Sequence, residues 1–466
     1  MKQIKQLSII CLLMAVQMNL FSQGYKLPDY KSFKLDNGLT VYLMELHDVP
    51  VISVSAILPA GAIYDGNKAG LASFTATALK HGTKSFTKAQ LDEEIDFIGA
   101  RVNTSASKEY ARLSAKFASK DKDKMLPIIQ EVLLEPSFNA EEFEKEKSRI
   151  LVQLEQQKES PRSVIRAYFD DFLFGDHVYG NSTGGIKPTV NDLTVNDLKN
   201  FYKANYMPNE AAISIVGDFS SAAMQKQITA LFSGWQKNSG SSSPNLASKP
   251  IAKPSESRVL LVNKDDAKET TFYIGSLGVS RNNPDLVSID VVNTLFGGRF
   301  TSMLNDALRV NSGLTYGARS GFSSLKNGGS FGISTFTALE TSEAAIDMAL
   351  DVLNKLHTKG LDQQSLTSAK NYVKGQFPPD YETTEQLAGL LTEMFWYNFD
   401  ESYINHFEKN VDDLDLAKAN KIIADYFPKD KLQFVIVGKS SEIKKIVEKY
   451  GKVTEVQIKD DIVRKN

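Results

Sequence analysis

The pattern of apolar and polar positions predicts the same order of strands and helices twice along the chain. In the first part, Asn37 and Gly38 separate two strand-like runs, 32–35 and 39–44, and Asn-Gly in this position is typical of a hairpin turn. The pattern then predicts a strand at 49–61, helices at 69–81 and 88–97, and a strand pair over 102–117. A longer helix is expected from Asn139, whose side chain can cap the first turn by accepting the backbone N–H of Glu142, while the Glu142 side chain accepts the backbone N–H of Asn139.

Two distant segments repeat each other in detail. Residues 193–219 and 414–440 each predict an amphipathic helix, a proline turn and a buried strand that ends at a glycine. The Tyr-x-Pro of the first segment recurs in the second at an offset of 220 positions, as Tyr206 and Pro208 against Tyr426 and Pro428. A tandem duplication explains an ordered series of matches at one long offset.

The duplication divides the chain into two similar domains, 24–236 and 255–466. The intervening stretch 237–254 is rich in Ser, Pro and Lys, which suits an extended linker. The second domain is expected to repeat the order of the first, with strands within 258–277 and a helix at 284–296. The predicted fold class is α+β: each domain is a mostly antiparallel sheet with helices packed on one face.

Composition and the N-terminus indicate an exported protein. Residues 1–23 combine a basic start, an apolar run too short to span a bilayer and a polar end, which predicts a secretory signal. The only cysteine, Cys11, lies in that signal, so cysteine chemistry is not expected in the mature chain, and a bacterial periplasm is the expected location. No transmembrane segment is predicted, and association with a membrane surface is left open. The net charge of −2, without charged blocks, argues against nucleic acid as a partner.

Eight short words occur in a fixed order over almost the whole mature chain: FKLDNGLTVYL, PAGAIYDGNKAGLA, HGT, GARVNTSAS, HVYGNSTGG, YMPNEAAISIVGDF, FGGRFTSML and LRVNSGLTYG. In these words the chain resembles the pitrilysin/insulinase family of zinc metallopeptidases, in particular its two-domain, mitochondrial-processing-peptidase-like branch. Active members of that family carry an inverted zinc motif, His-x-x-Glu-His, directly after a Gly-Leu-Ala like the one at 70–72.

The chain departs from the family pattern at every metal position. The two histidines correspond to Ser73 and Thr77, and the general base corresponds to Ala76. A hydroxyl is a poor zinc ligand, and a methyl group cannot act as a base. The later glutamate ligand corresponds to Gln153, and Glu155 lies on another face of that helix. We therefore expect no metal and no cofactor on this chain, and no catalytic residue.

The histidines do not restore such a site. His81 shares a helical face with Ser73 and Thr77, but one imidazole makes a weak site. We interpret it as a residue of the last helical turn that interacts with the helix dipole. His177 is interpreted as structural, and the remaining histidines show no mutual ligand spacing.

The second domain keeps a different element of the family. Arg309 and Tyr316 match the arginine and tyrosine that, in the family, hold the substrate backbone by hydrogen bonds. As ordinary surface and core residues they would have no such task, but the matching words around them favour substrate binding. The loop 297–299 also matches, and a turn ending a helix explains it equally well. The strand around 103–104 matches the edge strand on which active members lay substrate.

Three functions remain open from the sequence. In the first, the chain is the non-catalytic, substrate-binding subunit of an exported heterodimer or larger peptidase, in which a zinc-bearing homologous subunit cleaves peptides or unfolded proteins. In the second, it is a scaffold of the same fold without a role in proteolysis, and changes at Arg309 and Tyr316 then have no effect. The third, an autonomous peptidase with an unconventional site, requires bound zinc. The retained Arg309 and Tyr316 favour the first.

Overall fold

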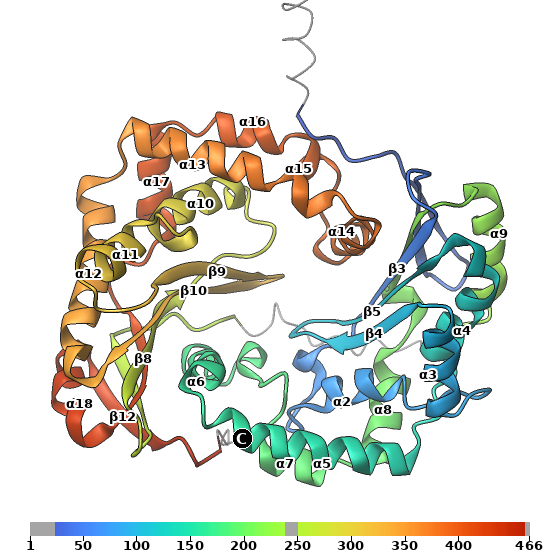
Figure 1. Ribbon diagram of the computed structural model, residues 1–466, viewed down its shortest axis with the longest axis horizontal. Coiled ribbons are helices and arrows are strands. Elements are labelled where there is room, and N and C mark those ends of the chain that lie inside the picture. The colour runs from blue at the N-terminus through green and yellow to red at the C-terminus, as the bar shows by residue number, and fades with distance from the viewer. Residues whose placement is uncertain (1–23, 238–249, 462–466) are drawn as a thin grey trace, which may run out of the picture.

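The computed structural model describes residues 24–237 and 250–461 (Figure 1). The predicted signal, 1–23, and most of the predicted linker lie outside the described residues, so both stay predictions. Within the described ranges, every helix is too short or too polar to cross a bilayer.

The first half contains one six-stranded sheet and its helices. The strands are β1 (Lys31–Lys34), β2 (Thr40–Glu45), β3 (Val51–Leu58), β4 (Arg101–Ala106), β5 (Ala111–Ala118) and β6 (Ala212–Gly217). The helices are α2 (Leu71–Ala78), α3 (Lys88–Phe97), α4 (Lys122–Leu134), α5 (Ala140–Gln157), α6 (Pro161–Phe174), α7 (Lys187–Asp192), α8 (Val195–Asn205) and α9 (Ser221–Phe232).

The second half contains another six-stranded sheet. Its strands are β7 (Arg258–Asn263), β8 (Glu269–Leu277), β9 (Arg319–Leu325), β10 (Gly328–Ala338), β11 (Gln433–Gly438) and β12 (Lys452–Gln457). Its helices are α10 (Leu286–Asn293), α11 (Met303–Asn305), α12 (Ser342–Lys359), α13 (Gln363–Gln376), α14 (Thr384–Tyr397), α15 (Ser402–Asn405), α16 (Phe407–Asp412), α17 (Leu416–Tyr426) and α18 (Ser440–Val447). Two π-helical segments, Thr294–Gly298 and Asp306–Asn311, flank α11.

The two sheets have matching strand orders, β1-β2-β6-β3-β5-β4 and β12-β7-β11-β8-β10-β9. Five strands correspond one to one, and the sixth differs. In the first sheet the outer strand β1 precedes β2 and pairs with it antiparallel, whereas in the second β12 comes last in the chain and pairs parallel with β7. Most strand pairs are antiparallel, so the predicted α+β duplication is confirmed.

Each half lends one helix to the sheet of the other half. The helices of the same half cover one face of each sheet, as predicted. The opposite face of the first sheet packs on α14 from the second half, and the opposite face of the second sheet packs on α6 from the first half (Figure 1). The sequence did not predict this exchange, which makes the folding of the two halves interdependent.

The two exchanged helices meet different surfaces. Helix α6 brings Phe169 and Leu173 against Val435 and Val437 of the second sheet. Helix α14 instead meets buried hydroxyls: Ser53 and Ser55 of β3 bond to Thr384 and Thr392 over 2.8 and 3.0 Å, and Ser214 of β6 donates to a carbonyl of α14. The polar positions of β3 are therefore satisfied by a helix more than 300 residues away.

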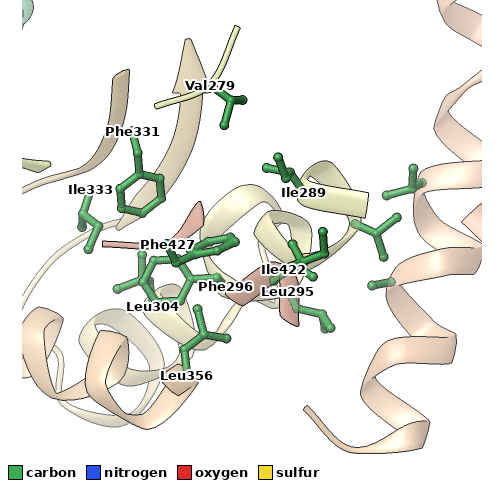
Figure 2. Close-up of a cluster of buried hydrophobic side chains, with 14 of the residues drawn as sticks. Val279, Ile289, Leu295, Phe296, Leu304, Phe331, Ile333, Leu356, Ile422 and Phe427 are labelled. Carbon is green, nitrogen blue, oxygen red and sulfur yellow. The ribbon is translucent and has the colours of Figure 1, made fainter. Parts of the chain in front are cut away.

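The core of the second half is built from aromatic rings. Phe296, Phe331 and Phe427 contact one another between the sheet and its helices, with centroid separations of 5.4 to 6.2 Å (Figure 2). Two local predictions need correction. The expected helix at 69–81 is the shorter α2, because the chain turns after Ala78. Asn139 does cap α5 by accepting from the Glu142 N–H, but the Glu142 carboxylate bonds Lys145 instead of returning the bond.

Candidate functional site

Helix α2 carries the degenerate motif, and its N-terminus is capped by a side chain from the preceding loop. Gly70 stands before it with φ 97°, a left-handed conformation that suits glycine. The buried carboxylate of Asp65 accepts the backbone N–H groups of Gly70 and Ala72 at 2.9 and 2.8 Å, which satisfies donors that the first turn leaves free. Burial raises the pKa of Asp65 to about 8. This role of Asp65 was not predicted from the sequence, because the residue lies in a loop outside the motif.

The positions of the degenerate metal site do come together in space. Ser73 and Thr77 lie half-buried on one face of α2, and Gln153 and Glu146 approach from α5. All four line a cavity of about 420 Å³ that α6 and the loop before α7 complete. Ala76 is buried in the core of the first half and does not line the cavity. The predicted grouping of residues is therefore present, although their chemistry is not that of a zinc site.

Arg149 is an exposed residue of α5 that does not line the cavity but bonds to two residues that do. Its Nε donates to Glu146 Oε2 at 2.9 Å, its Nη2 donates to Glu146 Oε1 at 2.5 Å, and its Nη1 reaches Gln153 Oε1 at 3.4 Å. Glu146 is thus paired with a guanidinium through both of its oxygens, a bidentate geometry that favours the charged carboxylate. Glu155 points elsewhere and pairs with Lys187 and Lys158.

The residues present do not fit a zinc ion. Two hydroxyls, a methyl group and an amide offer none of the imidazole, thiolate or carboxylate ligands that zinc prefers, and the nearby acid already binds a cation. Across the described ranges, no group of three or more His, Cys, Asp or Glu side chains is arranged to hold a metal. That this chain binds no metal stays a prediction.

His81 lies just beyond α2, is buried, and is not among the side chains that line the cavity. Burial lowers the pKa of His81, and the negative charges of Glu146 and Glu142 oppose this effect only in part. The neutral imidazole is therefore favoured, so the interaction of a charged histidine with the helix dipole, as interpreted from the sequence, is not supported. His177 is structural: its Nδ1 accepts the N–H of Tyr179 at 3.2 Å.

Tyr316 is presented to solvent in the second half, with 81% of its surface exposed. Its ring stacks on Phe336 at a centroid distance of 6.3 Å and an angle of 25°. The guanidinium carbon of Arg162, from α6 of the first half, lies 3.4 Å from the centre of the same Phe336 ring, and Glu269 pairs with Arg162 at 3.0 Å. A helix of one half thus supports the aromatic stack that carries Tyr316 in the other half.

Arg309 is held in a similar way on the π-helical segment Asp306–Asn311. Its guanidinium carbon lies 4.6 Å from the centre of the Phe300 ring, which is itself 65% exposed. No carboxylate of the described residues pairs with Arg309, so its N–H groups remain available for another partner. The loop to Tyr316 is fixed, because Leu314 and Thr315 both donate backbone N–H bonds to the Leu308 carbonyl.

The two sets of predicted residues are not in one cavity. Arg309 and Tyr316 do not line the cavity at the degenerate site. Tyr316 is connected to that cavity through Phe336 and Arg162 of α6, the helix whose Ser163 is part of the cavity wall. Close packing explains the glycine at position 297 of the loop 297–299, since a Cβ there would lie 2.3 Å from the Ser320 hydroxyl. The strand around 103–104 is β4, an edge strand as predicted.

Comparison with known proteins agrees with this architecture. The model of the insulinase family (peptidase family M16) matches residues 41–185, and the model of the peptidase M16 inactive domain matches residues 192–373. A solved structure of a peptidase M16 inactive domain from Pseudomonas fluorescens superposes with a TM-score of 0.81 at 24% identity, covering 88% of this chain and 98% of that one. A protease structure from Helicobacter pylori gives 0.82 at 22% identity, covering 89% and 100%. At these identities the structural likeness shows the fold alone.

Curated relatives include members described as proteases and one described as a non-peptidase. An uncharacterized zinc protease from Bacillus subtilis is 21% identical over 76% of this chain and 85% of its own length. A non-peptidase homolog from Helicobacter pylori is 23% identical over 82% and 88%. A probable mitochondrial-processing peptidase beta subunit from Arabidopsis thaliana is 24% identical over 62% and 54%. Two family models that together match most of the sequence, and the fold they describe, show that the chain belongs to the insulinase family of peptidases.

Proposed function

We propose that this chain is a non-catalytic, substrate-binding subunit of an exported heteromeric metallopeptidase, whose zinc is held by a homologous partner. The cavity that corresponds to the family's metal site lacks the family's ligands and general base, and Arg149 pairs with Glu146, the acid on its α5 side. An isolated chain with these residues has no means of activating water through zinc.

The presentation of Arg309 and Tyr316 is the observation that carries the proposal. Both side chains reach solvent, each rests on an aromatic ring, and within the described residues Arg309 has no acidic partner. A guanidinium and a phenol that are fixed in place but uncommitted can donate hydrogen bonds to the carbonyl groups of an extended peptide. The ligands proposed for them are peptides and unfolded proteins.

The match to the model of the peptidase M16 inactive domain and the similarity to a non-peptidase homolog support a non-catalytic role. The partner is proposed to be a homologous subunit of the same fold that carries the intact His-x-x-Glu-His motif. The predicted signal at 1–23 supports a periplasmic location for the complex, as does a predicted mature sequence that lacks cysteine.

The test mixes this chain with a zinc-bearing homologue from the same genome and measures cleavage of a fluorogenic peptide. We expect no cleavage by this chain alone, and cleavage by the mixture above that of the homologue alone. Arg309→Ala and Tyr316→Ala are expected to lower the turnover of the mixture at least several-fold. Tyr372→Ala, which removes another partly exposed tyrosine of the same half, is the matched control and leaves it unchanged.

The scaffold function makes the opposite prediction for the same variants. If the mixture assembles and cleaves equally well with Arg309→Ala and Tyr316→Ala, the pair has no role in substrate binding and the chain acts as a structural subunit. If the isolated chain cleaves the peptide and a chelator abolishes that cleavage, both functions are wrong.

A further inference from the structure

A second cavity, of about 310 Å³, lies in the C-terminal half and shares no residue with the cavity at the degenerate metal site. It is bounded by α10, β9 and the segment from α15 to α16. Leu286, Phe322 and Phe407 are among its apolar walls, and two charged side chains, Arg281 and Asp290, line it as well. Ile289, the neighbour of Asp290 on α10, can be located in Figure 2.

The carboxylate of Asp290 lines the cavity without a hydrogen-bond or ion-pair partner among the described residues. Its side chain has surface open to the cavity, and within the described residues it accepts no hydrogen bond and forms no ion pair. Although Asp290 as a residue is exposed, partial burial of its carboxyl group raises its pKa, the negative charge of Asp380 adds to this effect, and the positive charge of Arg281 opposes it. A cationic ligand in the cavity would favour the charged form of this carboxylate.

Arg281 faces the same cavity from an aromatic setting. Its guanidinium carbon lies 5.9, 5.1 and 4.9 Å from the ring centres of Tyr397, Phe399 and Tyr403. Its backbone N–H donates to the Leu325 carbonyl at 2.8 Å, which fixes the start of the side chain. No carboxylate of the described residues lies within 4.0 Å of the guanidinium, which donates to the Tyr403 hydroxyl, so further N–H donors are available for a ligand.

The opposite charges of Asp290 and Arg281 face one cavity without touching. They do not form an ion pair within 4.0 Å, and the cavity between them is lined by polar residues such as Asn293 and Ser324 as well as by apolar ones. The separation leaves room between them for a molecule that carries both charges. The volume is at the lower end of small-molecule sites, which span roughly 300 to 1,000 Å³, and the walls suit an apolar side chain.

We propose that this cavity binds a zwitterion, namely a free α-amino acid or dipeptide with an apolar side chain. Its ammonium group lies against Asp290, its carboxylate accepts hydrogen bonds from Arg281, and its side chain packs on Phe322 and Phe407. This site is separate from the proposed role of Arg309 and Tyr316, and does not depend on that role being correct.

Isothermal titration calorimetry on the full chain tests the proposal with L-leucine and L-leucyl-L-leucine as probes. N-acetyl-L-leucine lacks the ammonium charge, and L-leucinamide lacks the carboxylate. We expect one zwitterion to bind per chain, with affinity at least tenfold lower for both single-charge analogues. Asp290→Asn is expected to weaken the zwitterion at least tenfold and to remove its advantage over N-acetyl-L-leucine.

The matching substitution on the other side is Arg281→Lys, which keeps the charge but not the planar fork, together with Arg281→Gln. Both are expected to weaken binding, Arg281→Gln the more, and circular dichroism checks that each variant is folded. Asp306→Asn changes an exposed acid of the same half outside the cavity and leaves binding unchanged. Absence of heat from either zwitterion at 10 mM, or equal binding by the wild type and Asp290→Asn, overturns the proposal.

Discussion

Glu109 joins the two halves, and its replacement by leucine should show how much that junction contributes to stability. Its carboxylate is 1% exposed and lies in the first half. Oε1 accepts the hydroxyl of Tyr179 at 2.5 Å, and both oxygens accept the backbone N–H of Lys326 at 3.0 and 3.2 Å. Lys326 stands at the turn between β9 and β10, so one buried carboxylate of the first half holds the tip of a hairpin from the second.

The expected cost of Glu109→Leu follows from the groups it leaves unpaired. Leucine fills most of the volume but accepts nothing, so the buried Tyr179 hydroxyl and the Lys326 N–H each lose a bond to the carboxylate. An unsatisfied buried donor costs about 1 to 3 kcal/mol. The Tyr179 hydroxyl keeps a contact with the Asn327 N–H, but as an acceptor, which does not replace the lost bond. We therefore expect the free energy of unfolding to fall by about 2 to 5 kcal/mol.

Urea unfolding followed by circular dichroism measures this change, and a double-mutant cycle identifies its cause. Tyr179→Phe removes one of the two donors, so the loss from Glu109→Leu should be smaller in the Tyr179→Phe background than in the wild type. A loss below about 0.5 kcal/mol, or strictly additive losses in the cycle, would refute the reasoning, since the donors would then be satisfied in some other way.

Three further changes test separate parts of the structure. Arg162→Ala removes a cation–π contact of about 1 kcal/mol at a partly exposed site, so we expect the KM of the mixed peptidase to rise up to about five-fold with little change in stability. The KM of Arg162→Lys should fall between those of the wild type and Arg162→Ala, and 19F NMR of fluorotyrosine should show whether Tyr316 has become more mobile. The pKa of Asp65 is raised to about 8 in the folded chain, above its ordinary value, so its contribution to stability is present in acid and is lost as the pH rises from about 4 to about 8. Asp65→Asn should therefore make the free energy of unfolding less dependent on pH over that range. An unchanged slope would contradict a buried carboxyl group at this position. Gly297→Ala places a Cβ 2.3 Å from the Ser320 hydroxyl and 2.5 Å from its N, and we expect a loss of about 1 to 3 kcal/mol in urea unfolding, whereas a neutral result would mean that the π-helical segment adjusts freely.

The sequence predicted those features that depend on local pattern and on repetition. The Asn37-Gly38 hairpin, the capped start of α5 and the doubled sheet are all encoded within short segments, so periodicity was sufficient. The grouping of Ser73, Thr77 and Gln153 came from the family resemblance, and the cavity they share agrees with it.

The features that were missed depend on contacts between distant residues. The serines at 53 and 55 alternate with apolar residues along β3, which signals a second face, but nothing local shows that α14 would cover it. Arg149 stands three residues after Glu146, a spacing that permits their pair, yet the sequence does not say that Glu146 lines the cavity of the degenerate site. The support of Tyr316 by Arg162 spans the two halves and could be found only in the fold.

The central claim is that this chain cannot hold the ion on which hydrolysis in its family depends. Elemental analysis of the isolated protein, after equilibration with zinc and removal of loosely bound ions, tests it most directly. The account predicts far less than one zinc per chain, and the same low value for Ser73→Ala and Thr77→Ala. One equivalent of zinc in the wild type, lost in those two variants, would contradict it.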